Sequence, residues 1–169
     1  MTLPAGIIVR AATPDDAAAH VTLWKGVVAE SRWMEMEAFD HSVDEYRRLF
    51  EHSVTNDGAR YAAIAGRDVA GSIRIARING AAHQHVAYFT MAVAAHWRRR
   101  GIGAALLAAA IEWAHSHGVE RIVLNVFASN SAAIALYRKA GFLEEGILRK
   151  HTRKPWGDED EIMMALVNP

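Results

Sequence analysis

The sequence predicts a single α+β domain with a mixed central β-sheet of about seven strands, flanked by about four helices. Two observations lead to this fold class. Short β-prone runs and helical stretches follow one another in the order β, α, α, β, β, β, α, β, α, β, β. No break in composition, low-complexity tract or internal repeat divides residues 1–169, a length that fits one domain. We therefore expect one domain over the whole chain.

The N-terminal part of the chain predicts one strand and two helices. The β-prone run IIVRAA covers residues 7–12. Thr13 as N-cap, Pro14 at the first helical position and two acids after it predict a helix that ends at about Glu30. Residues 42–54 predict a second, short helix with four apolar side chains on one face. These are Val43, Tyr46, Leu49 and Phe50.

The middle of the chain predicts three strands and a long helix. Residues 60–66 and 69–78 are strand-like runs joined by a short turn, as in a hairpin. Residues 85–93 form a further strand. From Ile102 onward, apolar residues recur near a 3.6-residue period in a segment rich in alanine and leucine, which predicts a helix. Residues 117–127 then give a turn and a buried strand.

The C-terminal part predicts a helix and two strands. Residues 130–142 are helical up to Gly141, which ends the helix. Residues 142–154 and 158–167 are strands around the turn PWG. The run RKHTRKPWGDEDE places basic residues opposite acidic ones, so we expect cross-strand charge pairs there rather than a ligand site.

Composition and charge exclude several classes of function. Lys plus Arg and Asp plus Glu each total 19, so the formal net charge is zero and nucleic-acid binding through a broad basic surface is disfavoured. The chain has no cysteine, which excludes disulfides, a thiolate nucleophile and cysteine-bound metal. No basic leader and no apolar stretch of membrane-spanning length are present. We expect a soluble, cytoplasmic protein without membrane partners.

The start of the long helix lacks the residues that usually begin one. A helix N-terminus carries a partial positive charge and normally attracts Ser, Thr, Asp or Asn. Here three arginines, 98–100, stand with Gly101 and Gly103, and no acid follows until Glu112. Such a turn predicts an anion site, because backbone N–H groups and the helix dipole favour negative charge. Solvated surface arginines are the alternative.

Two phosphate-binding loops do not fit this turn. A dinucleotide fingerprint needs a third glycine where Leu106 stands, and a P-loop needs Gly-Lys-Ser or Gly-Lys-Thr, which is absent.

Residues 85–143 resemble the GNAT superfamily of acetyl-CoA-dependent N-acetyltransferases. The family's central signature is a strand ending in Val, followed by Arg or Gln, two residues, Gly, any residue, and Gly or Ala. Here it stands as Val93 followed by RRRGIG at 98–103. About 30 residues later comes the second signature, an Asn before a helix that carries a Tyr and closes on Gly-Phe. Here it stands as Asn130, Ala133, Leu136, Tyr137, Gly141 and Phe142.

The resemblance implies a role for each matching position. The backbone of residues 91–93 would pair with the pantetheine arm of acetyl-CoA, and the N–H of Val93 would polarise the thioester carbonyl. Residues 98–104 would wrap the pyrophosphate, Asn130 would bond the pantetheine arm, and Tyr137 would protonate the departing thiolate. The implied cofactor-binding residues are Met91, Ala92, Val93, Arg98, Arg99, Arg100, Gly101, Ile102, Gly103, Ala104, Asn130, Ala133 and Tyr137.

Helix geometry independently supports the second signature. Asn130 and Tyr137 are seven residues apart, about two turns or 10 Å along a helix, so both lie on one face. A tyrosine with a pKa near 10 is suited to donate a proton to a thiolate whose conjugate acid has a pKa near 8.5, as in cysteine. The alternative is that Tyr137 is a core residue packed with Ile134 and Ala133.

The general base has no clear position in the sequence. Strand 85–93 contains no Asp or Glu, although members of the family often place a base there. We take Glu35 and Glu37 as the candidate catalytic bases, with Glu30 and the pair His83 and His85 as further candidates and solvated surface charges as the alternative.

The segment SRWMEMEAF predicts one wall of an acceptor pocket. The segment carries more apolar side chains than a solvated loop usually does, namely Trp33, Met34, Met36 and Phe39. In the family, the region between the first two helices forms such a wall; a loop folded onto the core is the alternative. The expected substrate-binding residues are Trp33, Glu35, Glu37 and Tyr88.

Two His-x-His pairs, 83/85 and 115/117, do not indicate a metal. Neither has an obvious carboxylate or third ligand in the sequence nearby, and the second lies in the last turn of a helix, where cations suit the dipole. We expect no metal.

The resemblance implies transfer of an acetyl group from acetyl-CoA directly to a primary amine of a small molecule of the amino-acid or amine type, without an acyl-enzyme. An N-terminal or ribosomal-protein peptide acetyltransferase is an alternative, and a non-catalytic acyl-CoA-binding module is an alternative of another class. The expected partners are acetyl-CoA and an amine acceptor, with no nucleic acid and no membrane. A homodimer is left open.

Overall fold

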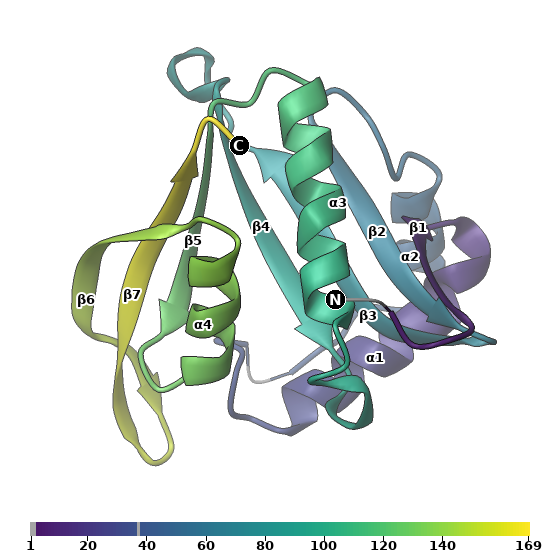
Figure 1. The fold of residues 1–169 in the computed structure, drawn as a ribbon. Helices are drawn as coiled ribbons and strands as arrows, with labels where there is room; N and C mark the ends of the chain where they lie inside the picture. Colours follow the sequence, from purple (N-terminus) through teal and green to yellow (C-terminus); the bar gives the residue numbers. More distant parts are fainter. Residues whose placement is uncertain (1–2, 37) are drawn as a thin grey trace. The chain divides into compact units, whose positions relative to one another are not determined.

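The computed structural model describes residues 3–36 and 38–169 (Figure 1). Within them, seven β-strands and four α-helices alternate in the order that the sequence predicts, so the α+β class is confirmed. Single-turn 3₁₀ helices lie at Pro14–Asp16, Ala81–His83 and Ala95–Trp97. The main elements are β1 (Ile7–Ala11), α1 (Ala17–Ala29), α2 (Val43–Phe50), β2 (Gly58–Ala65), β3 (Asp68–Arg77), β4 (Val86–Val93), α3 (Ile102–Ser116), β5 (Arg121–Phe127), α4 (Ser131–Lys139), β6 (Leu143–Lys154) and β7 (Gly157–Val167).

The strands form a mixed sheet in the order β1-β2-β3-β4-β5-β7-β6. β4 and β5 pair in parallel, with Ala87 opposite Ile122. Antiparallel pairing joins β1 to β2, β2 to β3, β5 to β7 and β7 to β6. Short turns join the antiparallel pairs β2–β3 and β6–β7, whereas the crossover through α3 allows β4 and β5 to run in parallel.

The chain separates into two compact units. The first consists of Met1–Ala76 and Thr90–Trp113, and the second of Arg77–Phe89 and Ala114–Pro169. β4 and α3 therefore contribute residues to both units. The one-domain organisation stays a prediction.

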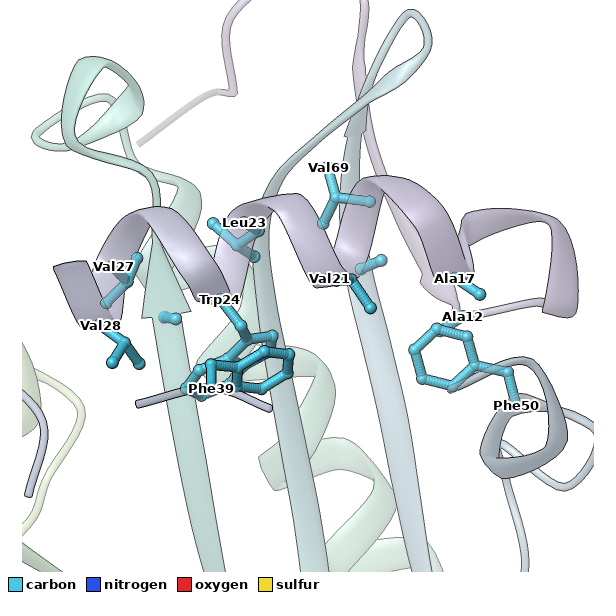
Figure 2. Close-up of a cluster of buried hydrophobic side chains, with 12 residues drawn as sticks. Ala12, Ala17, Val21, Leu23, Trp24, Val27, Val28, Phe39, Phe50 and Val69 are labelled. Carbon is cyan, nitrogen blue, oxygen red and sulfur yellow. The ribbon is translucent and has the colours of Figure 1, made fainter. Parts of the chain in front are cut away.

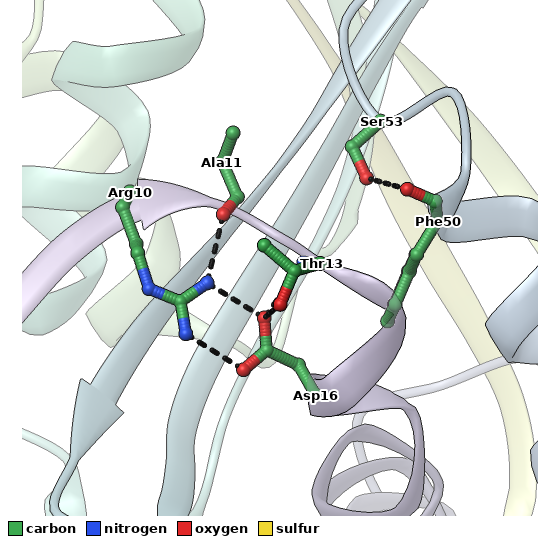
Figure 3. A network of polar contacts seen from close by, with 6 residues as sticks. All are labelled: Arg10, Ala11, Thr13, Asp16, Phe50 and Ser53. Carbon is green, nitrogen blue, oxygen red and sulfur yellow. Dashed lines mark hydrogen bonds and ion pairs between the residues drawn. The ribbon is translucent and has the colours of Figure 1, made fainter.

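A polar network begins the first helical segment, as Thr13 and Pro14 predict (Figure 3). The carboxylate of Asp16 accepts hydrogen bonds from the backbone N–H of Thr13 at 2.7 Å and from its hydroxyl at 3.0 Å. Arg10 binds both carboxylate oxygens of Asp16, at 2.7 and 2.8 Å. Asp16 thereby satisfies a helix-terminal donor and neutralises an arginine of β1.

α1 buries its apolar face in the first unit. Val21, Trp24 and Val28 recur at the three- and four-residue spacing of one helix face, and all are buried. Figure 2 shows the ring of Phe39 lying against that of Trp24, with ring centroids 6.1 Å apart and planes 8° from parallel. Phe39 thus folds onto the core, which is the alternative that the sequence left open for this residue.

The predicted apolar face of α2 is wrong for one of its four residues. Phe50 is buried, and Val43 and Tyr46 pack partly buried against the core cluster. Leu49 is 42% exposed. At 100° per residue, positions 43, 46 and 50 lie within about 60° of one another, and position 49 lies about 60° beyond position 46, at the edge of this face.

In the second unit, every second residue of β5 from Ile122 to Val126 is buried. Ile122, Leu124 and Val126 are buried, as strand geometry requires of one covered face. The predicted charge pairs of the β6–β7 hairpin are present in part: Arg153 Nε lies 2.9 Å from Asp158, and Arg149 Nη1 lies 3.8 Å from Asp160.

Candidate functional site

The first signature lies where β4 leads into α3, in the first unit. β4 ends at Val93, and α3 begins at Ile102 after a short turn and loop. The N–H of Ala105 donates to the carbonyl of Gly101 at 3.0 Å, the first turn of the helix ladder. Helix geometry leaves the N–H groups that precede it without an intrahelical acceptor. Residues 102–104 therefore present amide donors at the positive end of a helix dipole, which is what an anion requires.

The backbone of this loop is tightly bent. Gly101 has φ of 85°, a conformation that favours glycine. Arg99 adopts φ of 61°, which is uncommon for a residue with a Cβ. A side-chain-bearing residue stays in this region only where neighbouring contacts hold it.

The three arginines of the loop occupy different environments. Arg98 donates from both Nη atoms to Glu30, at 2.7 and 2.6 Å, and from Nε to the carbonyl of Val93 at 2.9 Å. The guanidinium of Arg100 lies over the ring of Trp97, 5.1 Å from its centroid. Arg99 is exposed, and its guanidinium has no hydrogen bond or ion pair among residues 3–36 and 38–169. Among the described residues, Arg99 is thus an exposed cation of the loop with neither an ion pair nor an aromatic ring against it.

The strand residues expected to meet the pantetheine arm have mixed burial. Ala92 is 4% exposed, while Met91 and Val93 are half-buried. The carbonyl of Ala92 lies where a Cβ on Gly71 of β3 would stand only 3.0 Å away. This close approach explains why residue 71 has no side chain, and it fixes the end of β4 against β3 in the first unit.

The second signature lies in the second unit. Asn130 caps α4, with its Oδ1 accepting a hydrogen bond from the N–H of Ala133 at 3.2 Å. Tyr137 is 8% exposed, and its ring packs edge-on against Phe89 with centroids 5.6 Å apart. Burial raises the pKa of Tyr137 to about 12. Its hydroxyl therefore remains protonated throughout the neutral pH range.

The residues expected to bind the acceptor lie in both units. Trp33 is half-buried beneath the guanidinium of Arg32, 4.6 Å from its ring centroid. Glu35 is exposed, and Glu37 lies outside the described residues. In the second unit, Tyr88 is 38% exposed on β4. The roles of these four residues stay predictions.

Two features escape the sequence patterns. Glu30, a further candidate for the base, forms an ion pair with Arg98, which lies 68 positions later in the sequence. No local sequence pattern predicts that pair. Glu161 is 1% exposed and Lys154 is 6% exposed, so these two charged hairpin residues are buried, which the expectation of cross-strand charge pairs did not include. Glu161 accepts a hydrogen bond from Thr152, and its register opposite buried Phe127 on β5 explains its burial. The sequence does contain a signal for the burial of Glu161, because strand alternation places it on the same face as Met163 and Ala165.

No group of three metal-binding side chains occurs among the described residues, the two His-x-His pairs included. Within the same residues, no helix is long and apolar enough to cross a membrane.

Comparison with known proteins places this geometry in a family. The model of the acetyltransferase (GNAT) family matches residues 26–142, more than half of the chain. The ribosomal protein bS18 alanine N-acetyltransferase of Salmonella typhimurium is 45% identical over 78 residues, which are 46% of this chain and 53% of the relative. The L-amino acid N-acetyltransferase AaaT of Escherichia coli is 36% identical over 101 residues, 59% of this chain and 62% of the relative. The chain thus spans about half to three fifths of these relatives.

A solved structure shows the same fold. The structure of yncA from Salmonella typhimurium, solved with its cofactor acetyl-CoA, matches with a TM-score of 0.88 at 18% identity. The match covers 97% of this chain and 95% of that chain. Because the family model spans both signatures and the elements that carry them, the chain belongs to the acetyltransferase (GNAT) family.

Proposed function

We propose that this protein is an N-acetyltransferase that moves the acetyl group of acetyl-CoA directly to the primary amine of a small molecule of the amino-acid or amine type. The observation that carries the proposal is the segment at residues 98–104, where the loop after β4 leads into the amide-bearing first turn of α3, in a chain of this family. The L-amino acid acetyltransferase among the relatives supports an amino-acid acceptor.

The loop would hold the donor by its pyrophosphate. The N–H groups of residues 102–104 fit an anion, and the exposed cation of Arg99 adds charge beside them. The N–H of Val93 would hydrogen-bond the thioester oxygen, where negative charge develops as the carbonyl is attacked.

The reaction requires one new bond and one broken bond. The amine nitrogen attacks the carbonyl carbon, the C–N bond forms, and the C–S bond breaks. The nitrogen loses a proton to a base, for which Glu35 and Glu37 are our candidates, and the leaving sulfur gains one. Tyr137 would donate to that sulfur. With a pKa of about 12, its hydroxyl stays protonated at neutral pH and is available to donate its proton to the sulfur as the C–S bond breaks.

The acceptor side favours a cationic amine with an apolar body. In the segment between α1 and α2, the acid Glu35 directly follows Trp33 and Met34, whose side chains are half-buried. A carboxylate attracts an ammonium group, and apolar side chains favour an apolar substituent.

Thiol release from acetyl-CoA against a panel of amino acids, polyamines, aminoglycosides and short peptides tests the proposal. We expect turnover with at least one small amine. Tyr137→Phe should lower kcat roughly 100-fold or more, as expected for loss of a general acid. Tyr61→Phe is the matched control, since Tyr61 on β2 is assigned no role in the reaction, and it should keep full activity. Equal turnover by Tyr137→Phe and the unmodified protein would remove Tyr137 from this role.

Two alternatives have their own outcomes in the same screen. The bS18 alanine acetyltransferase among the relatives favours a peptide acceptor, so preferential turnover of a peptide beginning with alanine would replace the small-molecule proposal. The absence of Asp and Glu from β4 favours a binding module without catalysis. Thermal stabilisation by acetyl-CoA with no turnover of any amine would support that module.

A further inference from the structure

One guanidinium ties together three segments of the first unit that are distant in sequence. Arg98 binds the carboxylate of Glu30 with both Nη atoms, at 2.7 and 2.6 Å, and the carbonyl of Val93 with Nε at 2.9 Å. Glu30 is the C-cap of α1, Val93 is the last residue of β4, and Arg98 opens the loop before α3. All three nitrogen atoms of the side chain are therefore used in holding protein to protein.

These contacts give the side chain of Arg98 a different environment from those of its two neighbours. The side chains of Arg98 and Glu30 are 32% and 28% exposed, and their charges cancel. A planar guanidinium bound in two places by one carboxylate has little freedom to turn toward a phosphate. Arg99 has no such partner within the described residues.

The loop that Arg98 opens needs external support. Arg99 lies at φ of 61° immediately after Arg98, and such a residue is retained only where its surroundings determine it. The contact of Arg98 with the Val93 carbonyl spans the turn and joins the end of the strand to the start of the loop. Glu30 in turn fixes Arg98 from outside that turn.

We infer that Glu30 is a positioning residue for the donor site: it holds Arg98 against the end of β4, so that Val93 and the amides of residues 102–104 keep the geometry that binds and polarises acetyl-CoA. The inference rests on the proposed function. It gives Glu30 a structural part in donor binding in place of the role of base, and it predicts that Arg98 acts through Glu30 and Val93 rather than as a phosphate cation.

Paired variants separate positioning from simple charge. Glu30→Gln removes a negative charge and Arg98→Gln removes a positive one, so an electrostatic role would make their effects on acetyl-CoA affinity opposite in sign. A positioning role predicts instead that both variants lose affinity for acetyl-CoA. We expect each variant to weaken acetyl-CoA binding and to lower kcat/KM about tenfold, and the double variant to lose about tenfold rather than a hundredfold, because both remove one interaction.

Further variants exclude general destabilisation. Glu30→Asp keeps the charge and should recover part of the loss. Glu145→Gln, which removes a comparable two-contact pair with Arg121 on the second unit, should leave kcat/KM and acetyl-CoA affinity unchanged. Arg99→Gln should weaken binding with a reduced salt dependence, the behaviour of a phosphate cation.

The outcomes distinguish this inference from the proposed function. Calorimetric binding of acetyl-CoA tests Glu30 and Arg98 whether or not an acceptor is found, while absence of turnover in the unmodified protein bears on the proposed function alone. Tighter acetyl-CoA binding by Glu30→Gln, or single losses that multiply in the double variant, would overturn the inference.

Discussion

The indole Nε1 of Trp24 donates a hydrogen bond of 2.8 Å to Nε2 of His20, one turn earlier on α1. Since Nε2 accepts, the neutral imidazole carries its proton on Nδ1, which is buried without a hydrogen-bond partner among the described residues. Tyr46 and Phe50 lie against the same ring, each with its centroid 4.8 Å away. His20 is thus a neutral histidine enclosed by aromatic side chains.

His20 predicts a loss of stability in mild acid. Burial, with a smaller effect of the Arg60 charge, lowers its pKa from 6.5 to about 4 in the folded protein. Between these values the unfolded chain binds more protons, so stability is complete above pH 6.5 and falls as the pH drops toward 4. The contribution of this group between pH 7 and pH 5 is about 2 kcal/mol.

Urea unfolding of His20→Gln at pH 7, 6 and 5 measures this contribution. Glutamine retains an acceptor for Trp24 but does not titrate, so the variant should lose about 2 kcal/mol less than the unmodified protein between pH 7 and pH 5. Parallel stability curves for the two proteins would contradict the assignment.

The lowered pKa of Asp16 predicts a second dependence of stability on pH, in a more acidic range. Burial raises its pKa, but hydrogen bonds from Arg10 and from the backbone and hydroxyl of Thr13 outweigh burial, so the net pKa is lowered from 3.8. Its contribution is present above pH 3.8 and is lost as the pH falls through the lower folded value. Asp16→Asn should therefore cost roughly 1–3 kcal/mol at pH 7.

The exposed neighbour Asp15 supplies the control for this prediction. Asp15→Asn should change stability by less than about 0.5 kcal/mol in urea unfolding at pH 7. A cost for Asp16→Asn that stays constant from pH 7 to pH 3 would show that the carboxylate charge is not what stabilises the helix start.

Two glycines predict opposite effects of the same substitution. Gly26 lies exposed in α1, and a Cβ there would meet nothing within 4 Å. Gly26→Ala should stabilise the protein by about 0.5–1 kcal/mol, since alanine loses less backbone entropy in a helix. A Cβ on Gly71 would lie 3.0 Å from the Ala92 carbonyl and from Leu106, so Gly71→Ala should destabilise by about 1–3 kcal/mol.

Thermal unfolding of the two alanine variants compares these positions directly. Opposite shifts in Tm are expected. Equal shifts would mean that the close approach of β3 to β4 and α3 does not determine the residue at position 71.

The raised pKa of Tyr137 predicts how kcat varies with pH in the alkaline range. With a pKa of about 12, the hydroxyl loses only about 1% of its proton by pH 10, whereas an ordinary tyrosine loses about half. The kcat of the unmodified protein should therefore show no decline due to Tyr137 up to pH 9.5, measured by thiol release with a saturating amine. A decline with a midpoint near pH 9 that disappears in Tyr137→Phe would contradict this assignment.

The elements and their order follow from local patterns in the sequence. Thr13 and Pro14 begin the first helical segment, Gly141 follows α4, and β5 lies within the predicted strand at 117–127, all as predicted. Each of these signals depends on residues only a few positions apart, where helix and strand periods fix which side chains share a face.

Side-chain partners between distant segments do not follow from such patterns. The sequence presents arginines 98–100 as equals, yet the fold pairs Arg98 with Glu30, places Arg100 over Trp97 and leaves Arg99 exposed. The run DEDE likewise presents four similar acids, of which Glu161 is buried.

The sequence by itself determined the elements of this α+β fold and the two signatures of the acetyltransferase family, because backbone periodicity and glycine placement are local properties. Only the tertiary structure decided which charges are paired and which are buried. Glu30 and Arg98 are 68 residues apart, and their ion pair exists because α1 and the end of β4 are brought together by packing of the apolar core of the first unit. Charge pairing depends on distances of a few ångströms, which only the folded chain sets.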